Sequence, residues 1–299
     1  MNNRTLRNYL LWAFGLAWPI QGLASYFALQ GQTRLFTTLT TLVMFAPLAA
    51  ALLAKIPLRD IGWGLKLRGK WKWFFAVWFL PIVLTALGAA LYYLLFPASF
   101  APGENAVRAQ YGEEMLAQLE TQGLTPSLLI VITFAGAMSY APFVNAIPAL
   151  GEEVGWRGAL YPMLKERFGK TKGRLLGGAI WGAWHWPLMI FAGYEYGLRY
   201  CGAPVLGMAL FLLFTIALGT LLDLAYEKTG SIWIPALGHG AVNAAANLPA
   251  IFLNPDYADR LILGPVPIGV IGGLPLLLLA AFVLLKKKDS TEEMRKESC

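Results

Sequence analysis

The chain has 299 residues, of which 57% are apolar and only 14% are charged, with a formal net charge of +7. A soluble domain carries about 25% charged residues, so this composition excludes an ordinary soluble fold. The basic residues are spread between long apolar runs, which is typical of membrane orientation and argues against a nucleic-acid surface. With only two cysteines, Cys201 and Cys299, the chain has no disulfide framework and no cysteine-based metal cluster.

Apolar runs of membrane-spanning length recur from one end of the chain to the other. Each is close to the ~20 residues that a helix needs to cross a bilayer. The sequence therefore predicts an all-α, polytopic membrane protein with about eight transmembrane helices in a single domain, residues 1–299. The expected spans are 8–29, 35–54, 73–97, 127–150, 174–193, 204–226, 231–253 and 264–285.

The distribution of lysine and arginine predicts the orientation. Most of these residues fall in the connections 55–72 and 165–174 and directly after the last span, at 286–288. The positive-inside rule places such segments on the cytoplasmic side. We therefore expect a multi-pass protein of the cell (inner) membrane with both termini in the cytoplasm.

Two segments outside the spans have distinct patterns. The charged residues 286–299 predict a disordered cytoplasmic tail. The segment 98–126 is the one long outer loop, and we expect an amphipathic helix in it. Its apolar residues recur every four positions, at Val107, Tyr111, Met115 and Leu119.

Three charged side chains lie in otherwise apolar sequence at the end of the fourth expected span. Glu152, Glu153 and Arg157 would each cost roughly 2.5–3.5 kcal/mol in hydrocarbon, so we expect them to face a cavity or one another. Glu153 and Arg157 are four residues apart and can pair on one helix face. Glu152 points about 100° away, toward the side of Trp156, which leaves its carboxylate free for another role.

The two histidines of the chain both lie inside expected spans. His185 belongs to the fifth span and His239 to the seventh, with Asn243 one turn further on the same face. Each residue alone is typical of a hydrogen bond between helices. Together with Glu152 they predict a buried site between the fourth, fifth and seventh helices, because three helices bring rare polar groups to a similar depth.

These residue types suit the activation of water. A buried carboxylate near an imidazole can act as a general base, and His239 with Asn243 offers donors for an oxyanion. Two histidines and a glutamate are also a known zinc ligand set, but the His-Glu-x-x-His spacing is missing. The residues alone therefore leave zinc possible, and they indicate no other cofactor.

The polar residues form a pattern that resembles the CPBP (CAAX protease and bacteriocin-processing) intramembrane proteases, which include type II CAAX prenyl endopeptidases. The resemblance covers about residues 127–250. At Trp181 the family usually has phenylalanine, so we expect a changed cavity shape there, with Trp156 as the second candidate cavity residue. The three motifs, in chain order, are Glu152-Glu153-x-x-x-Arg157, Trp181-x-x-x-His185 and His239-x-x-x-Asn243.

The resemblance implies a role for each site residue. Glu152 would polarise water with the help of His185, while His239 and Asn243 would stabilise the oxyanion. Glu153 and Arg157 would organise the site, and a metal-free mechanism is favoured.

The implied function is an intramembrane endopeptidase that cuts a membrane-held peptide of the prenylated CAAX type. Its partners would be a lipidated or membrane-embedded peptide and the lipid bilayer, with no nucleic acid. One alternative is a non-catalytic bacteriocin-immunity or scaffold protein. Another is a transporter, although the internal repeats that are typical of carriers are missing from the sequence.

Overall fold

The computed structural model describes residues 3–65 and 67–297, with side chains as far as residue 286. Within these residues the secondary structure is helical and contains no strand, which confirms the all-α prediction. Short 3₁₀ segments and a π-helical turn, Trp156–Leu160, join some of the helices. The α-helices are α1 (Asn3–Leu29), α2 (Thr33–Val43), α3 (Ala46–Leu53), α4 (Trp71–Leu95), α5 (Glu104–Tyr111), α6 (Glu113–Thr121), α7 (Pro126–Met138), α8 (Ala141–Gly155), α9 (Tyr161–Phe168), α10 (Lys170–Trp184), α11 (Trp186–Ala192), α12 (Val205–Thr229), α13 (Trp233–Ala245) and α14 (Leu274–Glu297).

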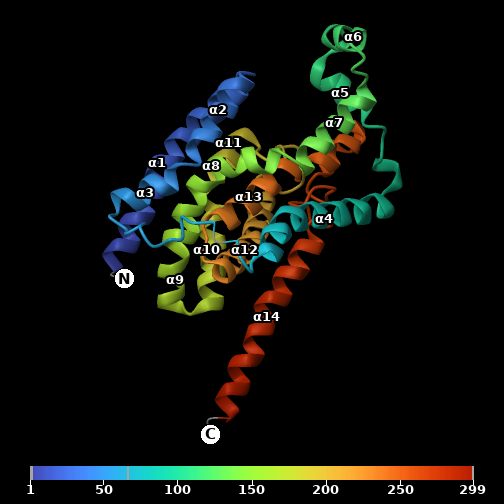
Figure 1. Ribbon diagram of the computed structural model, residues 1–299. Coiled ribbons are helices and arrows are strands. Elements are labelled where there is room, and N and C mark those ends of the chain that lie inside the picture. The colour runs from blue at the N-terminus through green and yellow to red at the C-terminus, as the bar shows by residue number, and fades with distance from the viewer. Residues whose placement is uncertain (1–2, 66, 298–299) are drawn as a thin grey trace.

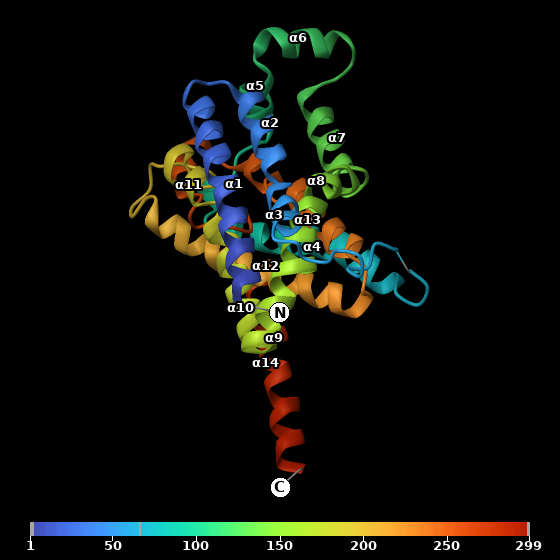
Figure 2. The ribbon, with the colours of Figure 1, turned by 90° about the vertical axis from the view of Figure 1, so that its left-hand side faces the viewer.

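Helix α8 lies in the middle of the bundle and carries the charged motif. It packs against α13 on one side and α3 on another, while α10 packs against α12 and α1 lies against α2 and α3. Helices α5 and α6 rise from one end of the molecule, and α14 runs away from the opposite end (Figures 1 and 2). Glu152 and Glu153 therefore lie on a helix packed against the one that carries His239 and Asn243.

Close helix approaches depend on glycine. A Cβ atom at Gly178 of α10 would come within 2.4 Å of the backbone of Ile216 in α12, and one at Gly240 of α13 within 2.3 Å of the Pro142 carbonyl in α8. Any larger residue would push these helix pairs apart. Small residues at these positions allow the neighbouring helices to approach closely.

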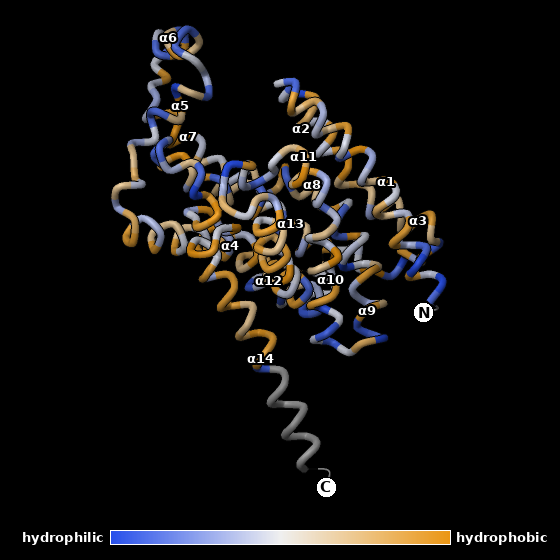
Figure 3. Tube along the Cα trace, turned by 180° about the vertical axis from the view of Figure 1, so that it is seen from behind, coloured by the Kyte–Doolittle hydropathy of each residue, from blue (hydrophilic) through white to orange (hydrophobic). Residues whose placement is uncertain are grey.

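The outer surface is that of a membrane protein, but eight spans are not confirmed. Among the described residues, four helices or helix pairs are long and apolar enough to cross a bilayer: Thr33–Leu53, Trp71–Leu95, Lys170–Ala192 and Val205–Thr229. The bent pair of α6 and α7, with 87° between the two helices, would make a fifth. Apolar segments follow the outside of α4, α7 and the first part of α14 (Figure 3).

Prolines divide two of the expected spans. The span 127–150 is broken at Ser139 and Tyr140, between α7 and α8, where Pro142 begins the next helix. The span 174–193 is broken at His185, where Pro187 lies in the first turn of α11. Proline has no N–H for the helical ladder, so the helix ends in the turn before it.

The end of the chain also differs from the prediction. The expected span 264–285 begins with turns rather than a helix, because the segment 264–273 is rich in glycine and proline, and α14 begins only at Leu274. Helix α14 then continues to Glu297, where a disordered tail was expected from residue 286. Residues 298 and 299 of that tail lie outside the described residues.

The loop 98–126 contains two short helices, α5 and α6, in place of one amphipathic helix. Gly112 separates them with a φ of +73°, a conformation open to glycine and unfavourable for other residues. The break rotates the second helix, so that Val107 and Leu116 are buried while Met115 is 50% exposed. The predicted four-residue stripe therefore does not continue across the loop.

Candidate active site

The buried ion pair at the end of α8 has a third member. Nη1 of Arg157 donates to Oε1 of Glu153 at 2.9 Å, which confirms the predicted pairing, and both side chains are fully buried. Nδ1 of His239, on α13, lies 2.9 Å from the same oxygen. Glu153 thereby joins α8 to α13 and sets the orientation of the His239 ring.

Glu152 faces away from this pair, as predicted, and is bonded through one oxygen. Its Oε2 accepts the indole N–H of Trp156 at 3.0 Å and that of Trp181 at 2.7 Å. Within the described part of the chain Oε1 has no hydrogen bond. The two N–H donors both bind Oε2 and leave Oε1 open to a ligand.

Arg157 is held by aromatic rings as well as by Glu153. Its guanidinium carbon lies 4.8 Å from the ring centre of Tyr161 and 4.6 Å from that of Trp181. Such cation–π contacts are strongest away from water. The π-helical turn that follows α8 carries Arg157, and π turns interrupt α-helices frequently at functional sites.

His185 occupies the break between α10 and α11. Its Nδ1 lies 3.0 Å from the carbonyl oxygen of Trp181. A carbonyl only accepts, so Nδ1 carries the proton and Nε2 is the acceptor of the neutral ring. The imidazole stacks on Tyr194, with 6° between the planes, and meets Phe211 edge-on.

One cavity of about 210 Å³ brings most of the predicted residues together. Glu152, His185, His239 and Asn243 all line it, and so does Trp181. Glu153 and Arg157 lie behind this lining in the packed interior, as does Trp156, which is fully buried. The amide of Asn243 is exposed and makes no hydrogen bond within the described part of the chain.

The sequence reasoning missed several lining residues, among them Tyr194 and Glu195. These two belong to the connection between α11 and α12, which lies between two of the expected spans. The connection folds back over the cavity. No motif or periodicity marks these residues, and only the turn that carries them explains their position.

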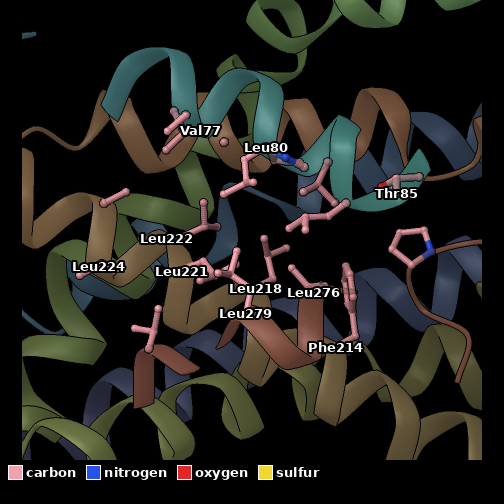
Figure 4. Close-up of a pocket in the computed structure, with 18 of the residues that line it drawn as sticks. Val77, Leu80, Thr85, Phe214, Leu218, Leu221, Leu222, Leu224, Leu276 and Leu279 are labelled. Carbon is pink, nitrogen blue, oxygen red and sulfur yellow. The ribbon is translucent and has the colours of Figure 1, made fainter. Parts of the chain in front are cut away.

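A second cavity, of about 240 Å³, lies between α4, α12, α13 and α14. Leucine, valine and alanine form most of its lining, and their side chains converge on the space between the helices (Figure 4). Phe214, Leu218 and Val242 line both cavities. This apolar cavity is therefore separated from the polar one by a single layer of side chains.

The described residues do not form a metal centre. No group of three or more His, Cys, Asp or Glu side chains among them is arranged to hold a metal ion. A catalytic zinc site uses three protein ligands, so the donor set does not fit one in this arrangement. The chemistry below is derived from the side chains alone.

Comparisons with known proteins agree with the motifs. Residues 126–245 match the family model described as type II CAAX prenyl endopeptidase Rce1-like. The chain is also 25% identical over 184 residues to "CAAX prenyl protease 2" of Methanococcus maripaludis, an alignment that covers 56% of this chain and 63% of that protein. Neither comparison favours the non-catalytic alternative. Both confirm the predicted resemblance to the CPBP proteases, and the family model places it over residues 126–245.

Proposed function

We propose that the chain is an intramembrane endopeptidase that hydrolyses a peptide bond in a membrane-held, lipid-modified peptide. The proposal rests on the group of polar side chains that line one cavity. Glu152, with Oε1 open, shares this cavity with two histidines and the exposed amide of Asn243. The Rce1-like segment covers these residues, which supports the CAAX class of substrate.

In the proposed reaction Glu152 is the general base. Oε1 takes a proton from a water molecule while Nε2 of His185 accepts the other hydrogen and fixes its position. The water oxygen adds to the peptide carbonyl carbon, and the C–N bond then breaks as Glu152 returns the proton to the leaving amine. General base catalysis of this kind contributes typically about 10²–10⁴-fold.

The oxyanion would be stabilised from α13. The amide of Asn243 can donate directly, because it has no partner among the described residues. His239 already donates Nδ1–H to Glu153, so its Nε2 is a donor only in the imidazolium form. Glu153 bonds to both Arg157 and His239, and this would fix the position of the His239 ring.

The apolar cavity is suited to a hydrocarbon chain. It adjoins the polar cavity through Phe214, Leu218 and Val242, so a peptide and its lipid could occupy the two at the same time. We expect Leu221→Trp, which fills the apolar cavity, to raise the KM for a farnesylated peptide. The matched control is Leu213→Trp on the exposed face of the same helix. Equal effects of the two variants on the KM would contradict the proposal that the lipid binds in this cavity.

The experiment that tests the function is cleavage of a quenched, farnesylated CAAX peptide by the purified protein in detergent. We expect one cut near the lipidated residue, and the same rate in the presence of a chelator. If the chelator abolished activity and zinc restored it, the metal-free mechanism would be wrong and zinc would be required. Failure to cut farnesylated, geranylgeranylated or unmodified peptides would contradict the proposed function.

A further inference from the structure

A tight turn brings one acidic side chain to the site cavity. Gly193 and Gly197 close the turn, with the N–H of Gly197 donating to the carbonyl of Gly193 at 2.7 Å, and both have positive φ values. Glu195 lies at the apex with a φ of +72°, a conformation that is unfavourable for residues other than glycine. A non-glycine residue kept in this region must be held there by its surroundings.

The flanking tyrosines hold the turn in place. The ring of Tyr194 stacks on the imidazole of His185, and the buried Tyr196 donates its hydroxyl to the carbonyl of Ile268 at 2.7 Å. Glu195 stands between these two anchors and lines the same cavity as His185. The strained position therefore serves to present a carboxyl group to the cavity.

No cation lies beside the carboxyl group of Glu195 among the described residues. Among the described residues that line the cavity there are two glutamates, Glu152 and Glu195, and no lysine or arginine. No described basic side chain pairs with Glu195. Burial raises the pKa of Glu195 above its ordinary value, and the hydrogen bond from Tyr194 lowers it only in part. A positively charged group of a bound ligand could therefore pair with the carboxylate of Glu195.

We propose that Glu195 determines substrate specificity by binding a positively charged group, a basic side chain or an amine, of the peptide held in the cavity. The inference rests on the proposed function, because it takes the cavity to hold a peptide. An ammonium or guanidinium group would gain a charge-assisted hydrogen bond from the carboxylate. A substrate carboxylate at the same place would meet a like charge and be disfavoured.

The test uses lipidated peptides that differ at one position, occupied by Lys, Gln or Glu and scanned along both sides of the cleaved bond. Wild type is compared with Glu195→Gln, which keeps the shape, and Glu195→Lys, which reverses the charge. At one position or more we expect wild type to have a KM about tenfold or more lower for Lys than for Glu. The preference disappears in Glu195→Gln and reverses in Glu195→Lys.

Two results would overturn this assignment. One is the same ranking of the three peptides in wild type and Glu195→Gln. The other is an equal fall in kcat for all three, which would mean that Glu195 only holds Tyr194 against His185. If no peptide is cut, the proposed function fails by itself. Binding of fluorescent versions of the same peptides, measured by anisotropy, then decides the role of Glu195 by the same charge ranking.

Discussion

Trp181 lines the cavity and also bonds directly to the proposed base. Its indole N–H donates to Oε2 of Glu152, and a hydrogen bond to a charged group contributes about 1.5–3 kcal/mol. We predict that Trp181→Phe lowers the rate of hydrolysis about tenfold or more without abolishing it, because Trp156 still donates to the same oxygen.

The matched control for Trp181→Phe is Trp186→Phe. The buried indole N–H of Trp186 has no hydrogen-bond partner in the described part of the chain, so its removal should leave the rate unchanged. Kinetics of the two purified variants on one peptide measure the difference. Equal rates for both would show that the bond from Trp181 to Glu152 has no catalytic consequence.

The raised pKa of Glu195 predicts a pH-dependent stability. A carboxyl whose pKa is higher in the folded than in the unfolded state stabilises the fold at low pH, and that contribution is lost as the pH rises through the folded-state pKa. Glu195→Gln removes the ionisable group. We therefore expect its Tm to exceed that of wild type at about pH 7 but to match it near pH 4, around the ordinary pKa of glutamate.

Thermal unfolding in detergent at the two pH values checks this expectation. A variant that is less stable than wild type at about pH 7 would contradict it. Greater stability combined with poorer use of cationic peptides would be a stability–activity trade-off at one residue.

At the residue scale, the sequence predicted contacts within a helix and missed those between helices. The i,i+4 spacing was enough for Glu153 with Arg157 and for the direction of Glu152 toward Trp156. The bond from Trp181 to Glu152 and that from His239 to Glu153 depend on how α10 and α13 pack on α8. Helical periodicity carries no information on that packing.

Among the elements, α9, α10 and α12 are joined by a buried ionic network. Asp223 of α12 is fully buried and accepts from Arg174 of α10 at 2.7 Å and from Lys165 of α9 at 2.5 Å. Breaking a buried pair costs about 3–5 kcal/mol, because it leaves an uncompensated charge. We predict that Asp223→Asn lowers the Tm markedly and loosens the cavity wall formed by α10 and α12.

Glu227→Gln is the control for this network. Glu227 pairs with Lys165, Lys170 and Arg174 but is 22% exposed, and Arg174 and Lys165 keep their bonds to Asp223, so we expect a smaller loss of stability than for Asp223→Asn. Thermal unfolding of both variants gives the comparison. If Glu227→Gln destabilises the protein as much as Asp223→Asn does, the argument from burial is wrong.

The helix boundaries show why element prediction was incomplete. Long apolar runs gave the right regions, but hydropathy ignores the proline at 142 and the proline at 187, each of which begins a new helix. The second break matters for the site, since it puts His185 at a helix junction with its ring facing the cavity. Proline alone does not mark such breaks, because Pro19, Pro81 and Pro148 lie inside helices.

For the whole molecule, the orientation in the membrane is open to direct test. Cys201 is exposed in the connection between α11 and α12, which the positive-inside pattern places on the outer side. In the Cys299→Ser variant we predict that a membrane-impermeant maleimide labels Cys201 in intact cells. In Cys201→Ser, labelling of Cys299 should require permeabilised cells. The reverse pattern would invert the topology and place the turn of Glu195 in the cytoplasm.

The overall class of the molecule was predictable and its detailed architecture was not. Composition and apolar runs were sufficient for an all-helical membrane protein, and three motifs were sufficient for the CPBP resemblance. The number of spans was not, because α13 and the glycine- and proline-rich segment 264–273 do not form helices of spanning length. The breaks in these helices depend on how the helices pack around α8, and the hydropathy of a local sequence window does not report that packing.

The central claim is that Glu152 activates water in this cavity. The most direct measurement is the rate at which purified Glu152→Gln cuts the farnesylated peptide, relative to wild type and to Glu114→Gln, an exposed glutamate of α6. Glutamine keeps the volume and the acceptor for both indoles but is no base, so we predict a loss of about 10²–10⁴-fold with an unchanged Tm. Wild-type rates in a folded Glu152→Gln would contradict the account.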